Sequence, residues 1–155
     1  MPLFNKILDK LIKKKITTSI VESCTGGLIS SIFTSKSGIS KIYNLRLITY
    51  SNESKISILG ISSSFLERHG AVSNEVAKAM CNKLKKLTKS NLCISTTGIA
   101  GPYGSTKSKP VGLVYIGVKK KNKILITKNL FKYKNRKAIQ NATVKRTLEI
   151  IRSTI

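Results

Sequence analysis

The chain of 155 residues contains no tryptophan, one histidine, three cysteines and only six acidic residues. Its cysteines, Cys24, Cys81 and Cys93, are an odd number at wide spacing, which fits neither a disulfide framework nor a zinc site. Because His69 is the only histidine, we expect no metal ion in the protein. Reduced thiols in a cytoplasmic protein are the best match to this composition.

Long hydrophobic runs are also missing from the sequence. No apolar stretch approaches the ~20 residues that are needed to cross a bilayer, and the N-terminus lacks a signal-peptide cleavage pattern. We therefore expect a cytoplasmic protein that does not act in a membrane. A chain of this length, 41% hydrophobic and 23% charged, is predicted to form a single domain over residues 1–155.

Negative charge is scarce, which leaves a formal net charge of +23. Such a field attracts the phosphates of nucleotides, nucleic acids and membrane surfaces. The lysines are dispersed along the chain, however, and a general compositional bias would explain them without any partner. Since there is no basic-aromatic repeat and no recognisable nucleic-acid motif, nucleic acid stays an open alternative and is not the favoured partner.

Apolar periodicity predicts that helices and strands alternate along the chain. The strands are expected at residues 17–21, 45–50, 91–96, 112–118 and 123–131. The helices are expected at residues 3–14, 26–35, 62–68 and 136–151, in a short segment after Ser51 and in a long one from Ser73. Early alternation followed by two adjoining strands predicts a three-layer α/β/α domain with a mixed, mostly parallel sheet.

Three polar turns follow the ends of predicted strands, at residues 22–27, 50–55 and 96–101. If the strands are parallel neighbours, these turns converge on the edge of the sheet where ligands bind in open α/β folds. Backbone N–H groups at the first turn could hold an anion, and Gly26 and Gly27 would let a ligand approach closely. The alternative for Ser23 in this turn is a plain helix cap.

The residue types in these turns limit the chemistry that is available. No Ser-His-Asp triad can be assembled, because His69 lies in a segment without these turns. A hydroxyl nucleophile then needs another base, and a lysine with a lowered pKa can serve. An ordinary lysine has a pKa of ~10.4, so a neutral amine requires burial or close cations, for which Arg46 and Arg136 are the candidates.

Five ordered blocks, VESCTGG, TYSNESK, HGAVSNEVA, STTGIAGP and KPVGLVYIG, resemble the CinA C-terminal domain family. The resemblance covers roughly residues 3–142. Characterised members are nicotinamide mononucleotide (NMN) deamidases of the PncC type, so it implies a carboxamide hydrolase of the pyridine nucleotide cycle in NAD metabolism. It also implies a homodimer, and a stand-alone chain without the larger N-terminal domain of long CinA proteins.

Carried over by position, the resemblance implies that Ser23 attacks the carboxamide carbon and Lys55 takes its proton. Tyr50 and Thr97 would assist by hydrogen bonding. The substrate-binding residues that it implies are Thr25, Gly26, Gly27, Asn52, Gly98, Gly101 and Arg136, of which Arg136 would hold the phosphate or support the site. The products would be nicotinic acid mononucleotide and ammonia, with no metal and no organic cofactor.

The chain departs from the family pattern before its last helix, where Lys134-Asn135-Arg136 replaces Gly-Asp-Arg. A second hypothesis is a non-catalytic phosphometabolite- or nucleic-acid-binding protein that retains the fold. Lys55 separates the two, since an enzyme needs a neutral amine whereas a binding protein needs only positive charge. We also expect Cys24 to be a small buried thiol and Glu22 to order its turn.

Overall fold

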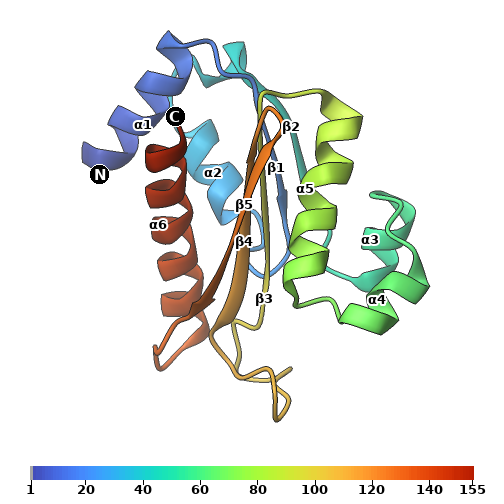
Figure 1. Ribbon diagram of the computed structural model, residues 1–155. Coiled ribbons are helices and arrows are strands. Elements are labelled where there is room, and N and C mark those ends of the chain that lie inside the picture. Colours follow the sequence, from blue (N-terminus) through green and yellow to red (C-terminus); the bar gives the residue numbers. More distant parts are fainter. Residues whose placement is uncertain (1) are drawn as a thin grey trace.

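The computed structural model describes residues 2–155, and its strands form one five-stranded sheet in the order β2-β1-β3-β4-β5 (Figure 1). The strands are β1 (Thr18–Glu22), β2 (Tyr43–Ile48), β3 (Leu92–Gly98), β4 (Leu113–Lys120) and β5 (Lys123–Leu130). β1 pairs in parallel with both β2 and β3, whereas β4 is antiparallel to both β3 and β5. Only β4 therefore runs against the other strands, which confirms the predicted mixed, mostly parallel sheet.

Helices cover both faces of this sheet, as predicted for a three-layer α/β/α domain (Figure 1). One face carries α1 (Pro2–Lys13), α2 (Leu28–Thr34) and α6 (Arg136–Thr154). The other face carries α3 (Asn52–Ser57), α4 (Ser63–His69) and α5 (Asn74–Thr88), and a short 3-10 turn, η1 (Ile39–Lys41), precedes β2. Within residues 2–155 no helix combines the length and the apolar character needed to span a bilayer.

Alternation along the central strands fills a separate core on each face of the sheet, because successive strand residues point to opposite sides. Ile20 packs in the core beneath α1, α2 and α6, while Val21 packs in the core beneath α4 and α5. β1 is buried along its whole length, whereas the edge strands β2 and β5 alternate between half-buried and exposed residues. The end of β1 is thus held firmly from both sides.

The second strand lies two residues earlier than its periodicity predicted. β2 covers Tyr43–Ile48 because Thr18 of β1 pairs with Tyr43 and Glu22 pairs with Ile48. The chain leaves the ladder at Thr49, whose amide donates to the carbonyl of Glu22 at 2.9 Å. Tyr50 therefore lies in the turn after β2 and not at the end of the strand.

Candidate active site

The three polar turns meet in the structure and line one cavity of about 260 Å³. Ser23 follows β1, Tyr50 and Lys55 follow β2, and Thr97 lies near the end of β3. Arg136, the first residue of α6, lines the same cavity from the opposite layer. Because β2, β1 and β3 are parallel neighbours, their carboxyl ends share one edge of the sheet, and the predicted convergence is confirmed.

Lys55 is buried in this cavity, with 1% of its surface exposed. Ser51 caps α3 and fixes the helix start, which turns the Lys55 side chain inward toward the end of β1. The Lys55 amine Nζ lies 3.2 Å from Oγ of Ser23 and donates to the Thr49 carbonyl at 2.7 Å. A longer contact of 3.5 Å reaches the Tyr50 carbonyl. A lysine and a serine are thereby placed within hydrogen-bonding distance.

Burial lowers the pKa of Lys55 from its ordinary value of 10.5. A nearby Cys24 thiolate would raise this pKa, but burial also raises the pKa of the Cys24 thiol to about 12, so that the thiol is uncharged at neutral pH. Among the described residues no carboxylate forms an ion pair with Lys55. Desolvation and not the expected Arg46 or Arg136 cations accounts for the shift.

The partners of Lys55 can accommodate a neutral amine. A neutral amine has two hydrogens and one lone pair, and the carbonyls of Thr49 and Tyr50 can accept only hydrogens. The lone pair is then left for the Ser23 hydroxyl, which alone among these three partners can donate as well as accept. This arrangement lets Lys55 accept the Ser23 proton.

Glu22 replaces the missing side-chain cap of α2. Its buried carboxylate accepts from the amides of Gly27, Ile29 and Ser30 at 2.8–3.1 Å. It also accepts from the hydroxyls of Thr25 and Ser30 at 2.6 Å. A negative charge at a helix N-terminus is favourable, and these five bonds satisfy the carboxylate fully. The turn that carries Ser23 is consequently rigid, and the expectation for Glu22 is confirmed.

The glycine pair shapes this turn and does not line the cavity. Gly26 and Gly27 have φ values of 60° and 99°, a region that favours glycine. Their amides donate to the Ser23 carbonyl and to Glu22, so neither is available to an anion. Within residues 2–155 the amide of Cys24 has no such acceptor, and Cys24 does line the cavity. The amide of Cys24 is therefore the better candidate for an oxyanion donor.

Arg136 is held in place by two hydrogen bonds across the cavity. One nitrogen donates to the Gly101 carbonyl at 2.8 Å and the other to the Tyr50 hydroxyl at 2.7 Å. Asn135 caps α6 by accepting from the Ala138 amide, and this cap fixes the start of the helix at Arg136. A guanidinium has five N–H donors, which leaves three for a ligand.

The cavity wall formed by the end of β3 holds its shape through backbone packing. The Thr97 hydroxyl donates to the Ala71 carbonyl at 2.7 Å and so ties β3 to the loop before α5. A side chain at Gly98 would come within 2.7 Å of the Leu113 carbonyl, which leaves room only for glycine. Thr97, Gly98 and Gly101 all line the cavity, as the sequence assignment requires.

Besides Gly26 and Gly27, two further residues assigned to substrate binding lie outside the cavity lining. Asn52 is exposed on the first turn of α3. The Thr25 hydroxyl is buried, donates to Glu22 and contacts the Thr96 hydroxyl at 2.9 Å. Thr25 thus supports the turn from behind, and neither side chain is placed to touch a ligand.

Tyr103 and Gln140 join the site although their residue types alone did not single them out. Tyr103 lines the cavity from the glycine-rich loop with 89% of its surface exposed. Gln140 of α6 donates to the Cys24 carbonyl at 2.9 Å and so connects α6 to the turn that carries Ser23. The signal that could have found Tyr103 is the length of the loop between β3 and β4, residues 99–112. His69 lies outside the cavity lining and packs against Phe65 with the two rings tilted by 51°. No cluster within residues 2–155 could hold a metal ion.

Comparison with known proteins identifies relatives along the whole chain. A protein of Thermoanaerobacter pseudethanolicus described as competence-damage inducible is 46% identical over 146 residues, which are 94% of this chain and 35% of that protein. A protein of Caldicellulosiruptor saccharolyticus with the same description is 44% identical over 152 residues, 96% of this chain and 36% of that protein. The chain therefore spans about one third of the length of the curated relatives that it matches.

Solved structures show the same architecture. The competence/damage inducible protein CihA of Agrobacterium tumefaciens superposes with a TM-score of 0.93 at 33% identity, covering 98% of this chain and 93% of that one. A CinA superfamily protein of Escherichia coli gives a TM-score of 0.92 at 25% identity, covering 99% and 88%. The sequence model of the family described as CinA C-terminal domain matches residues 1–155 of this chain. This chain belongs to the CinA C-terminal domain family.

Proposed function

We propose that the chain hydrolyses the carboxamide of NMN to nicotinic acid mononucleotide and ammonia, with Ser23 as nucleophile and Lys55 as general base. The observation that carries the proposal is the 3.2 Å contact between the buried Lys55 amine and Oγ of Ser23. A buried lysine with no carboxylate partner among the described residues is poorly explained by stability, since burying a charged amine is unfavourable. The general-base role gives that burial a purpose.

The first half of the reaction forms an acyl-enzyme. Ser23 Oγ attacks the carboxamide carbon while the neutral Lys55 amine takes the hydroxyl proton. The amide of Cys24 stabilises the oxyanion, and each such donor contributes ~2.7–4 kcal/mol in related chemistry. The Lys55 ammonium then returns the proton to the leaving nitrogen, the C–N bond breaks, and ammonia departs.

Water completes the cycle. With its proton gone, Lys55 deprotonates a water molecule that attacks the ester carbonyl, and Ser23 leaves with the proton from Lys55. The positive pyridinium ring of bound NMN would lower the pKa of Lys55 further, because like charges disfavour the ammonium. The substrate thereby helps to create the base that acts on it.

Arg136 supports the choice of a phosphorylated substrate. No acidic side chain lines the cavity, and Arg136 keeps unused N–H donors beside its bonds to Tyr50 and Gly101. A planar guanidinium binds a phosphate with two parallel hydrogen bonds. The cavity of about 260 Å³ is small for a whole nucleotide, so the ring and carboxamide would fill it and the phosphate would lie at its open side.

The test is ammonia release from NMN by the purified protein, beside Ser23→Ala and Lys55→Ala. Release that disappears in both variants, with their folds intact by circular dichroism, supports the proposal. The rate should rise with pH along a limb whose pKa lies below 10.5, since only the neutral amine is a base. A folded wild type that binds NMN without releasing ammonia would contradict the proposal and favour the non-catalytic phosphometabolite-binding alternative.

A further inference from the structure

A second cavity of about 420 Å³ lies at the amino ends of β1 and β3, at the opposite end of the sheet from the proposed active site. Its lining consists of Lys14, Lys15, Ile16, Asn91, Lys120 and Lys121. No acidic residue contributes to it. We call this cavity the lysine hollow.

Asn91 connects the three chain segments that frame the lysine hollow: the loop before β1, the loop before β3 and the turn between β4 and β5. Its side-chain oxygen accepts from the Thr17 hydroxyl at 2.8 Å and from the Thr17 amide at 3.3 Å. Its own amide donates to the Thr17 hydroxyl at 2.9 Å, and its carbonyl accepts from the Lys121 amide at 2.9 Å. These hydrogen bonds therefore hold the backbone segments around the hollow in fixed relative positions.

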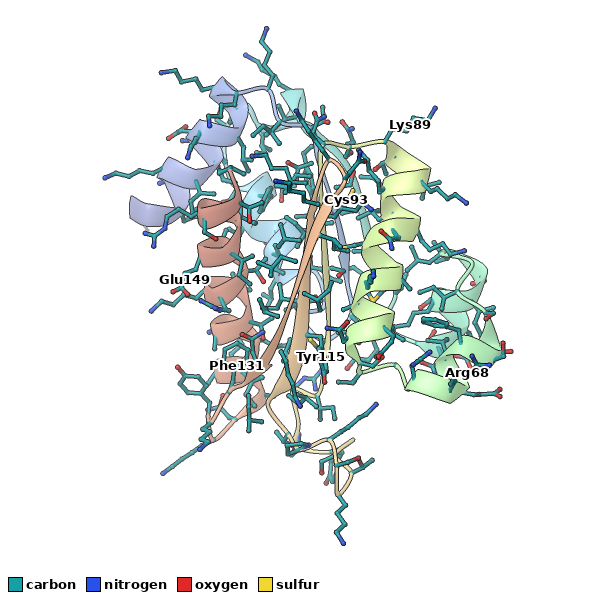
Figure 2. All side chains as sticks on the ribbon, viewed as in Figure 1. Arg68, Lys89, Cys93, Tyr115, Phe131 and Glu149 are labelled. Carbon is teal, nitrogen blue, oxygen red and sulfur yellow. The ribbon has the colours of Figure 1, made fainter. Side chains whose placement is uncertain are left out.

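Each of these three segments contains a lysine with an unfavourable, positive φ. Lys15, Lys89 and Lys121 have φ values of 50°, 56° and 53°, and they are the only non-glycine residues with positive φ within residues 2–155. Glycine or asparagine adopts this conformation more readily, so lysine carries a backbone penalty at all three places. Figure 2 shows Lys89 projecting from the end of α5 at this end of the molecule.

In the described part of the chain, no acidic side chain forms an ion pair with the lysines of the hollow. Lys14 and Lys120 each have a backbone acceptor near the end of α6, at Ile155 and Thr154. Lys15 and Lys121 are exposed, and their side-chain amines have no hydrogen-bond acceptor among the described residues. The hollow thus presents mostly donors and positive charge to whatever enters it.

We propose that the lysine hollow binds the phosphate backbone of a nucleic acid. Exposed Lys13, Lys89 and Lys123 extend the positive surface beyond the hollow, which suits a chain of phosphates better than one small anion. Ile16 is the only apolar residue in the lining and is half-buried, so nothing there could insert into a bilayer. The lining has no aromatic ring for base stacking, and binding should therefore be independent of base sequence.

The experiment measures the binding of a short fluorescein-labelled DNA duplex by fluorescence anisotropy at several salt concentrations. With about four phosphate contacts, affinity should fall about 100-fold as salt rises from about 50 to about 200 mM. The double variant Lys15→Glu/Lys121→Glu should lose most of this affinity and reduce the salt slope by about 2. The control Lys78→Glu/Lys128→Glu changes two exposed lysines elsewhere by the same charge and should retain most of the affinity.

A second variant separates charge from folding. Lys15→Gly/Lys121→Gly removes both charges and relieves both positive-φ positions, so its melting temperature should hold or rise while its DNA affinity falls. Two duplexes of different sequence should bind equally well, and hydrolysis of NMN should be unchanged in all of these variants.

Four results would overturn the proposal. One is no duplex binding at the lowest salt, and another is an equal loss in the Lys78/Lys128 control, which would mean that dispersed charge binds the DNA. Competition by inorganic phosphate at concentrations that leave salt effects negligible would indicate a small-anion site. Binding of vesicles rich in phosphatidylserine, dependent on Lys15 and Lys121 while the duplex fails, would indicate a membrane surface.

Discussion

At the carboxyl ends of the strands one buried lysine contacts a hydroxyl, whereas at the amino ends four lysines surround a hollow that is open to solvent. Burial lowers the pKa of Lys55, whereas the side chains of Lys15 and Lys121 are exposed to solvent. The same residue type can therefore supply a base at one end and fixed positive charge at the other. Surroundings and not residue identity decide between chemistry and charge.

The two ends also differ in how acids are used. The turn that carries Ser23 depends on Glu22, one of only six acidic residues in the chain. Around the lysine hollow no acid lines the wall. In a protein with a net charge of +23, this buried and fully hydrogen-bonded carboxylate fixes the backbone of the turn that carries Ser23.

The largest expected effect tests whether Lys55 acts as a base. Lys55→Arg keeps positive charge but cannot lose its proton, so ammonia release from NMN should fall about 10³-fold or more, as for Ser23→Ala. Lys78→Arg, on the exposed face of α5, is the matched control and should leave the rate unchanged. Retained activity in Lys55→Arg would mean that the two ends use lysine in the same way.

The next effect concerns the turn that carries Ser23, the proposed nucleophile. Glu22→Gln supplies one acceptor oxygen and an NH₂ group that must face N–H or O–H donors, so unfolding free energy should drop by about 3 kcal/mol. Urea denaturation measures this loss. Glu53→Gln, an exposed change in the first turn of α3, should alter stability by less than ~0.5 kcal/mol. Equal losses in both variants would contradict the role given to the Glu22 network.

A smaller effect is expected at the phosphate end of the proposed site. Arg136→Lys replaces a fork that bridges Tyr50 and Gly101 by a single point charge, so KM for NMN should rise about 10-fold with little change in kcat. Arg152→Lys near the end of the same helix is the control. A fall in kcat at constant KM would instead place Arg136 in the chemical step.

The smallest effect is on stability as a function of pH. Because the folded-state pKa of Lys55 lies below 10.5, the unfolded chain binds more protons between these two values, and stability rises with pH there. Lys55→Met should therefore be more stable than the wild type near neutral pH, by a margin that shrinks toward pH 10.5. Both proteins keep Cys24, whose raised pKa acts in the opposite direction above 9.0 and is coupled to the Lys55 charge, so the two proteins are compared below pH 9.0, where this thiol stays protonated.

Several assignments could be made from the sequence because they depend on local pattern. Strand periodicity located the three polar turns and made their convergence a reasonable expectation, and the family resemblance singled out Ser23, Tyr50, Lys55 and Thr97 within them. NMN as substrate, the homodimer and the cytoplasmic location stay predictions. Asn52 was assigned through the family resemblance, and only the structure shows that it is exposed on the first turn of α3, outside the cavity lining.

The sequence by itself determined the order of the elements and the three-layer class, since both follow from hydrophobic period and turn composition, and the motifs shared with the CinA C-terminal domain family singled out the four residues that meet in the proposed site. Only the tertiary structure decided which polar groups were already used. Gly27 and Thr25 are committed to Glu22, while Lys55 is left without a carboxylate partner in the described chain. Burial and hydrogen-bond competition depend on residues far apart in sequence, and local pattern does not contain them.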